Sequence, residues 1–365
     1  MSLGPCTLAR VGHQAENEFD DVVTRVGILT GGGDCPGLNA AIRAIVRRAD
    51  QHNIQTFGFQ DGWHGVLEQQ ATQLTISTTR GLLHRGGTIL GTSRVDPYRE
   101  DNGPARIMEA LEVHRLDGLI VIGGEGTLSA TTRLHEDEGL PVIGLPKTID
   151  NDVGGTELTV GFLTAVDTAT EAVDRLHSTA ESHNRVMVLE VMGRHAGWIA
   201  TYAGMAGGAD VILIPELPFD IDAVGRHLKH RAGTGRDFSI VVVAEGAVPK
   251  PGTMELPDSP LDEFGRPRLG GLGVTIANEI EVRTGFSARY TILGHTQRGG
   301  TPNPMDRVIA TRMGVKAIDT ANRGEWGRMA SYRCGVVDTV TLADATAELA
   351  TVPEALYRVA EVFFG

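Results

Sequence analysis

Short, nearly continuous apolar runs alternate along the chain with stretches in which apolar residues recur every three or four positions. The apolar runs predict buried strands at residues 22–30, 54–59, 118–122, 140–145, 185–192, 210–214, 239–243 and 289–293. The helical spacing predicts helices at 38–49, 102–114, from Ser129 onward, and at 159–178, 273–284, 306–319 and within 342–365. Because strands and helices alternate, we expect an α/β protein with parallel sheets covered by helices on both faces, the second sheet opening at 185–192.

Two of the predicted strands end in glycine-rich segments that lead into helices. The first strand is followed by residues 31–37, reading GGGDCPG, and the strand at 118–122 is followed by residues 123–127, reading GGEGT. A strand, a glycine loop and a helix in this order present free N–H groups and a positive helix end to a phosphate, although a triple glycine can also be a simple tight turn. Neither the dinucleotide fingerprint nor the P-loop pattern follows the first strand.

The stretch 145–152, reading LPKTIDND, is the candidate catalytic segment. Pro146 ends the strand at 140–145, and Lys147, Thr148, Asp150 and Asp152 follow within six residues. Carboxylates just past a strand end can act as a base or bind a metal at the edge of an α/β sheet. The alternative is a polar turn that caps the next helix.

Composition and charge narrow the class of protein. The chain has 365 residues, 41% of them hydrophobic, and a net charge of −13, which argues against a nucleic-acid partner. The lack of a membrane-length apolar run or a signal peptide predicts a cytoplasmic protein. We expect residues 1–21 to be a loose tail and the Pro- and Gly-rich residues 248–269 to form an excursion loop.

Six motifs in order give the sequence a specific resemblance. Residues 31–43 (GGGDCPGLNAAIR), 123–127 (GGEGT), 146–152 (PKTIDND), 192–198 (MGRHAGW), 244–246 (AEG) and 293–302 (LGHTQRGGTP) together resemble the 6-phosphofructokinase family from about Arg25 to about Asp319. The resemblance implies two Rossmann-like domains with the site in the cleft between them. The expected donor domain is 22–160 plus about 297–345, and the sugar-phosphate domain is about 161–296 plus 346–365.

The resemblance also implies catalytic roles. Asp150 would be the general base for the 1-hydroxyl of fructose 6-phosphate, and the residue chemistry agrees with that role. Thr148 and Arg194 would face the transferring phosphoryl group, with Arg194 neutralising charge that grows in the transition state. Asp152 would support the base. Glu125 stands where the family usually has Asp as a Mg²⁺ ligand, so its side chain is one methylene longer.

The binding residues follow in the same way. The donor would be held by the glycine loop at Gly33 and by Arg94, Val95, Gly124, Glu125, Gly126, Thr127 and Lys147. Glu245 would accept a sugar hydroxyl, and Met192 and Gly193 would also contact the sugar. Its 6-phosphate would lie among Arg185, Arg289, His295 and Arg298, because charge-assisted hydrogen bonds suit a dianion. In the family, the equivalents of Arg185 and Arg289 come from a neighbouring subunit, which implies a homodimer or homotetramer.

The donor is ATP or pyrophosphate, and two positions bear on the choice. Pyrophosphate users typically carry Asp at the position of Gly126, where a carboxylate would collide with a nucleotide; glycine leaves that space open. Lys147 is typical of pyrophosphate users, but it can also be tolerated by an enzyme that uses ATP. We therefore expect ATP with Mg²⁺, keeping pyrophosphate as the alternative. A non-catalytic sugar-phosphate or nucleotide sensor is the alternative from another class, and the intact Thr148, Asp150 and Arg194 argue against it.

Overall fold

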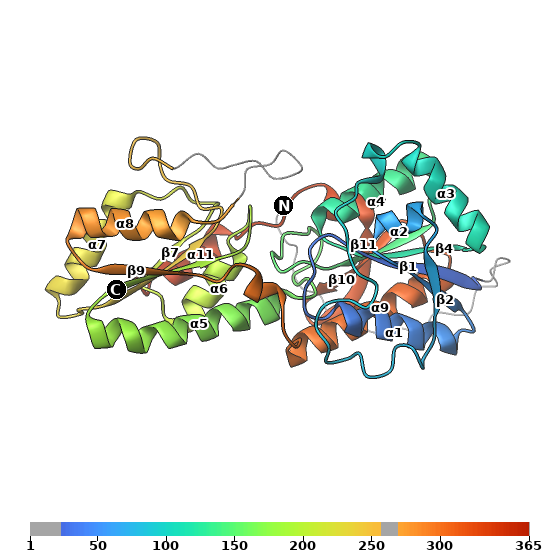
Figure 1. The fold of residues 1–365 in the computed structure, drawn as a ribbon, viewed down its shortest axis with the longest axis horizontal. Helices are drawn as coiled ribbons and strands as arrows, with labels where there is room; N and C mark the ends of the chain where they lie inside the picture. The colour runs from blue at the N-terminus through green and yellow to red at the C-terminus, as the bar shows by residue number, and fades with distance from the viewer. Residues whose placement is uncertain (1–22, 257–268, 365) are drawn as a thin grey trace.

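The structure, a computed structural model, describes residues 23–256 and 269–364, which form two bodies side by side, each built on one sheet (Figure 1). The predicted α/β fold with parallel sheets and helices on both faces is confirmed. The tail at 1–21 and part of the segment 248–269 lie outside the described residues. No helix in the described ranges is long and apolar enough to cross a membrane.

The larger sheet has seven strands in the order β11-β10-β5-β4-β1-β2-β3. Its central strands β1, β2, β4, β5 and β10 pair in parallel, and the edge strands β3 and β11 are antiparallel. The strands are β1 (Arg25–Gly31), β2 (Gln55–Phe59), β3 (Ala71–Leu74), β4 (Gly118–Gly123), β5 (Val142–Pro146), β10 (Arg328–Arg333) and β11 (Val336–Thr341). Gly31 pairs with Gly123 and Gly123 with Pro146, so both glycine loops and the candidate catalytic segment leave the sheet at one edge.

Alternation of buried side chains along these strands places helices on both faces. Ile28, Ile120 and Ile143 face one core, which α1 (Leu38–Gln51) and α9 (Pro304–Asn322) cover. Leu119, Val121 and Val142 face the other. That second core is covered by α2 (Trp63–Leu67), α3 (Gly103–His114), α4 (Glu125–Glu138) and α10 (Leu342–Thr346).

The smaller sheet has four parallel strands in the order β7-β8-β6-β9. They are β6 (Val186–Val191), β7 (Val211–Leu213), β8 (Ser239–Ala244) and β9 (Ala288–Ile292). One face packs on α5 (Phe162–His183) and α6 (Trp198–Gly207), and the other on α7 (Ile221–Gly233) and α8 (Leu272–Thr284). Residues of β1, α5 and β6 belong to one apolar cluster, so the core is continuous between the two bodies.

The predicted elements were wrong in four details, the first being that helices α2, α6 and α7 were not predicted. The helix predicted from Ser129 begins at Glu125, which puts the residues of the second glycine loop into its first turn. The region 342–365 holds α10 and α11 (Glu354–Glu361) in place of one helix. Strands β3, β10 and β11 were not predicted, because they are half-exposed edge or near-edge strands that lack a continuous apolar run.

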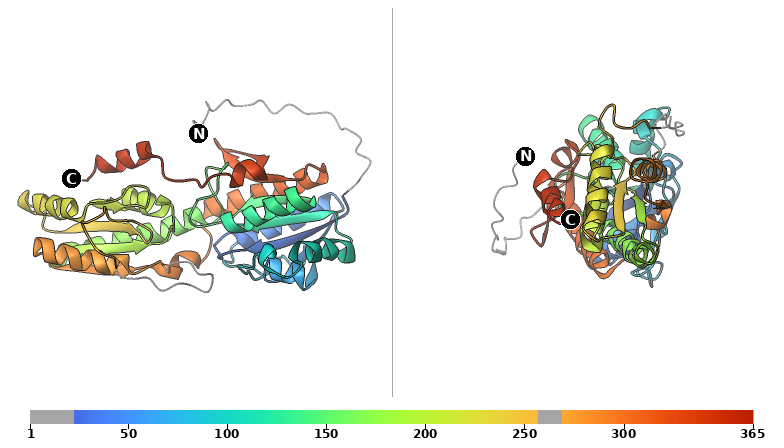
Figure 2. Two further views of the ribbon diagram at one scale, coloured as in Figure 1. Left: turned by 90° about the horizontal axis from the view of Figure 1, so that it is seen from above. Right: turned by 90° about the vertical axis from the view of Figure 1, so that its left-hand side faces the viewer.

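The C-terminal segment crosses from the larger body to the smaller one (Figure 2). Ala350 lies at the crossing, where its N–H donates to Asp152 O at 2.9 Å and its carbonyl accepts Trp198 Nε1 at 2.9 Å. Farther on, the Tyr357 hydroxyl donates to Ile212 O at 2.6 Å. The segment therefore joins the loop after β5 to α6 and β7.

Asp306 fixes a second junction near the site. Its fully buried carboxylate accepts hydrogen bonds from Gly161 N at 2.9 Å, Thr164 N at 2.8 Å and Thr164 Oγ1 at 2.5 Å. The first turn of α9 is thus tied to the first turn of α5, just after the loop that follows β5.

We expect Asp306→Ala to lower the free energy of unfolding by about 2 to 3 kcal/mol, because it leaves buried donors unpaired. Urea unfolding measures the change. The matched control is Asp174→Ala, which removes an exposed carboxylate of α5 and should change stability by less than about 0.5 kcal/mol. Equal effects of the two variants would contradict the importance of this junction.

Candidate active site

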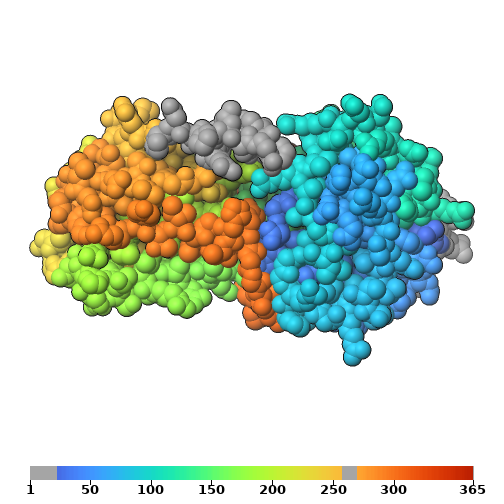
Figure 3. All heavy atoms as spheres, viewed as in Figure 1, coloured from blue at the N-terminus to red at the C-terminus, as the bar shows by residue number. Residues whose placement is uncertain are grey.

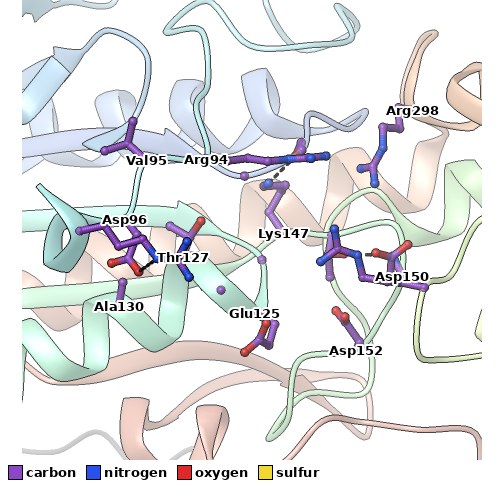
Figure 4. A pocket seen from close by; sticks show the side chains of 17 residues that line it. Arg94, Val95, Asp96, Glu125, Thr127, Ala130, Lys147, Asp150, Asp152 and Arg298 are labelled. Atoms are coloured by element: carbon purple, nitrogen blue, oxygen red, sulfur yellow. Dashed lines mark hydrogen bonds and ion pairs between the residues drawn. The ribbon is translucent and has the colours of Figure 1, made fainter. Parts of the chain in front are cut away.

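A cavity opens where the carboxyl edge of the seven-stranded sheet meets the smaller body (Figures 3 and 4). It is lined by residues of the two glycine loops, by the segment after β5 and by two arginines that follow β6 and β9. The lining residues are Gly32, Gly33, Arg94, Val95, Asp96, Arg99, Gly124, Glu125, Gly126, Thr127, Ala130, Lys147, Thr148, Asp150, Asp152, Arg194 and Arg298.

The loop after β5 is held in shape by its own polar side chains. Thr148 N donates to Val160 O at 3.2 Å, and Thr159 Oγ1 donates to Thr148 O at 2.6 Å. Asn151 has φ 53°, a left-handed conformation that asparagine tolerates, and its amide bonds Thr159 N and Glu157 O. Asn151 was missed as a site residue, although the left-handed tolerance of asparagine between two aspartates was a usable signal.

Asp150 and Asp152 enter the cavity with buried carboxylates. Oδ1 of each is buried and has no hydrogen-bond partner among the described residues. Burial raises the pKa of Asp150, and Arg298 and Arg194 oppose that rise. Burial, followed by repulsion from Asp150, raises the pKa of Asp152 to about 7. Both groups are therefore poised to exchange protons or to accept a cation or a hydroxyl donor.

A sharp turn after β6 directs Arg194 to this pair. Gly193 has φ 144° and Arg194 has φ 52°, and a Cβ on Gly193 would lie 2.4 Å from Ala196 O. Only glycine fits at the first position of this turn. Arg298, at the end of the short helix η2 (Gly294–Arg298), lies against Gly33 and donates from Nη1 to Asp34 O at 3.3 Å.

Lys147 lies below the first glycine loop. Its side chain is fully buried, and Nζ donates to Gly31 O at 2.7 Å and Gly33 O at 2.5 Å. Burial lowers the pKa of Lys147 to about 8. The ammonium thus lies among loop carbonyls at the floor of the cavity (Figure 4).

The far end of the cavity is built by α4 and the segment after Arg94. Glu125, Gly126 and Thr127 form the first turn of α4, so the positive end of a 14-residue helix faces the cavity. A Cβ on Gly126 would meet no atom within 4 Å. Sequence reasoning missed three lining residues at this end, Asp96, Arg99 and Ala130, which lie outside the recognised motifs.

The predicted sugar residues divide into two groups. Met192, Gly193, Glu245 and His295 follow the carboxyl ends of β6, β8 and β9, on the side of the cavity. Burial, followed by repulsion from Asp150, raises the pKa of Glu245 to about 7. The carboxylates of Glu245 and Asp150 are therefore close enough to repel each other. Met192 N also donates to Gln297 Oε1 at 3.3 Å.

Arg185 and Arg289 lie at the opposite, amino ends of β6 and β9. Val186 pairs with Ala288 at the start of the two strands, a strand length from the cavity. Arg289 is half-exposed and forms an ion pair with Glu281 at 3.1 Å. The structure does not bring these two arginines to the site of their own chain.

The metal site was assigned to Glu125, whose Oε1 accepts a hydrogen bond from Ser129 Oγ at 3.1 Å. Among the described residues no group of three or more His, Cys, Asp or Glu side chains is arranged to hold a metal. A cation here would complete its shell with donor phosphates and water, as Mg²⁺ commonly does. The role of Glu125 stays a prediction.

Known proteins resemble the chain over nearly its whole length. It is 53% identical over 342 residues to a Streptomyces coelicolor protein named pyrophosphate–fructose 6-phosphate 1-phosphotransferase, covering 93% of this chain and 100% of the relative. It is also 53% identical over 343 residues to a Mycobacterium tuberculosis protein named ATP-dependent 6-phosphofructokinase, with the same coverage. Relatives with different donors in their names are thus equally similar.

Solved structures share the fold. The phosphofructokinase of Saccharomyces cerevisiae superposes with a TM-score of 0.77 at 30% identity, covering 93% of this chain and 46% of that one. A pyrophosphate-dependent phosphofructokinase from Marinobacter aquaeolei gives a TM-score of 0.77 at 22% identity, covering 91% and 86% of the two chains. The sequence model described as phosphofructokinase matches residues 25–321. With these matches and a cavity built from the predicted motifs, the chain belongs to the phosphofructokinase family.

Proposed function

We propose that the protein transfers the terminal phosphoryl group of ATP to the 1-hydroxyl of fructose 6-phosphate, with Asp150 as general base. The observation that carries this proposal is the buried Oδ1 of Asp150, which has no hydrogen-bond partner among the described residues, in a cavity that is also lined by two glycine loops and Arg194. A sensor would bind the same ligands but would have no use for a base at that position.

The reaction follows from the charges around Asp150. Its carboxylate takes the proton of the attacking hydroxyl while the sugar oxygen bonds to the terminal phosphorus and the bond from phosphorus to the bridging oxygen of ADP breaks. The guanidinium of Arg194 stabilises the negative charge that develops on the transferring group. Thr148, whose Oγ1 accepts Asp150 N at 3.1 Å, keeps the base aligned.

The preference for ATP rests on the open space at Gly126. The lining of the cavity also includes residues outside the two glycine loops, namely Val95, Asp96, Arg99 and Ala130. Empty space above Gly126 leaves room for a nucleotide. The similarity to the Streptomyces coelicolor enzyme named for pyrophosphate keeps the shorter donor as the second candidate.

Magnesium fits the carboxylates at this edge. Asp152 has a buried carboxylate oxygen without a partner among the described residues, and Glu125 lines the same cavity. These two side chains would hold Mg²⁺ together with the donor phosphates, and the bound ion neutralises phosphate charge. The chain's own residues supply the base and the guanidinium.

The positions of Arg185 and Arg289 support an oligomer. Both arginines lie at the amino ends of their strands, where they can serve a neighbouring copy but not their own cavity. We therefore propose a homodimer or homotetramer with shared sugar-phosphate sites. The proposed domains are those expected from the sequence, 22–160 with about 297–345 for the donor and about 161–296 with 346–365 for the sugar.

Side-by-side initial rates with ATP and with pyrophosphate, each with fructose 6-phosphate and Mg²⁺, test the donor. We expect turnover with ATP, and Gly126→Asp should lower kcat/KM for ATP by about a hundredfold or more through steric and charge exclusion. Gly126→Ala is the matched control and should change it by less than about threefold, because a methyl group has open space there. Turnover with pyrophosphate alone would overturn the ATP assignment.

Asp150→Asn keeps the shape of the side chain and removes the base. We expect kcat to fall by about a thousandfold or more, while the Kd for fructose 6-phosphate changes by less than about fivefold. Calorimetry measures the binding and a coupled assay measures ADP release. Near-normal turnover of this variant would contradict the assignment of the base.

Asp152→Asn should stabilise the ligand-free protein increasingly as the pH rises. The pKa of Asp152 in the folded state, about 7, exceeds its ordinary value of 3.8, so ionisation opposes folding. This cost is absent below pH 4, grows up to about pH 7 and is then constant. Between pH 5 and pH 8, in EDTA, the advantage of the variant in unfolding free energy should increase by on the order of 2 kcal/mol. A difference that does not depend on pH would contradict the raised pKa.

A further inference from the structure

Every carbonyl of the first glycine loop, residues 31–34, accepts a hydrogen bond from outside the loop. Lys147 Nζ binds the first and third carbonyls at 2.7 and 2.5 Å. Thr92 Oγ1 binds the second at 2.6 Å, and Arg298 Nη1 approaches the fourth at 3.3 Å. The loop is therefore anchored by its carbonyl groups, and Lys147 is the donor that binds it twice.

Anchored carbonyls determine the direction of the N–H groups. The peptide bonds of the described residues are all trans, so each C=O is opposed by the N–H of the next residue. The N–H of Gly32 is taken by Ser93 O at 2.8 Å. Those of Gly33 and Asp34 have no acceptor among the described residues, and Gly33 lines the cavity. Such N–H groups form an anion-binding nest.

Lys147 holds the loop with most of its hydrogen-bonding capacity, which leaves at most one ammonium hydrogen for a phosphate. The side chain is 1% exposed and two of its three ammonium hydrogens are committed to loop carbonyls. A move of Nζ toward a donor phosphate would release the first and third carbonyls. The N–H of Asp34, which shares a peptide bond with the third carbonyl, would then lose the orientation that a phosphate requires.

We propose that Lys147 is a positioning residue that binds the loop 31–34 from beneath and presents its N–H groups to the phosphates of the donor. This inference rests on the proposed function, because it takes the cavity to be the phosphoryl-donor site. In this proposal Lys147 keeps the loop in a shape that both ATP and pyrophosphate need. Its presence therefore does not conflict with the preference for ATP that the open space at Gly126 indicates. Charge supports the assignment, since carbonyl dipoles partly offset the cost of burying the ammonium.

Hydrogen exchange of the ligand-free protein, followed by mass spectrometry, tests the proposal. In Lys147→Met, a peptide spanning residues 32–35 should lose protection at the Gly32 amide, which is bonded to Ser93 O in the wild type, and this amide should exchange about tenfold faster with no donor present. The KM for ATP should rise in the same variant. If exchange of this amide is unchanged in the free protein while the KM rises, Lys147 is a direct phosphate ligand and the proposal fails.

Two further variants keep the test decisive. Thr92→Val removes the hydroxyl bond to the second carbonyl without removing a charge, and Thr92 does not line the cavity. It should raise exchange in the same residues, even if Lys147→Met does not fold. Arg94→Met removes an exposed guanidinium at the cavity and should leave loop exchange in the free protein unchanged while raising the KM for ATP. If the amides of this loop exchange as slowly in Thr92→Val as in the wild type, the proposal that bound carbonyls orient the loop is wrong. Because exchange is measured without substrates, the result is independent of whether the donor assignment holds.

Discussion

The register of three parallel strands is the constraint on which this site depends. Gly31, Gly123 and Pro146 are the last residues of neighbouring strands β1, β4 and β5, and they lie side by side. Parallel pairing therefore delivers two glycine loops and the catalytic segment to one edge, although about 90 residues of chain separate the first loop from the second. A shift of one residue in this register would move each apolar side chain of the shifted strand from one core to the other, where it would not fit its neighbours.

Charge around the cavity is arranged in opposed sets. Burial raises the pKa values of Asp150, Asp152 and the half-buried Glu245. Arg194, which follows β6, and Arg298, which follows β9, oppose that rise at Asp150 and favour its ionised form. Burying the carboxylates without the guanidiniums, or the guanidiniums without the carboxylates, would be costly. The site therefore needs the two bodies in contact. The continuous apolar core and the hydrogen bonds of Ala350 and Asp306 hold them there.

Predictions from the sequence agree best with the structure where they depend on residues that are close together in the chain. The alternation of strands and helices, the glycine loops and the pair Asp150 and Asp152 were predicted, and the structure brings their side chains together. Errors occurred at half-exposed strands such as β10 and β11, whose burial depends on neighbours distant in sequence. Asp96, Arg99 and Ala130 were missed for a related reason, since loop geometry brings them to the cavity.

By itself, the sequence determined the α/β class, the phosphofructokinase family and the residues of the candidate catalytic segment. The class follows from apolar periodicity, and the family and the candidate residues follow from the resemblance carried by the six motifs. Tertiary structure decided what Lys147 contacts, which ends of β6 and β9 carry the arginines, and that the space beside Gly126 is open. Those features depend on distances between segments far apart in the chain, which packing and strand register set and which no local pattern records.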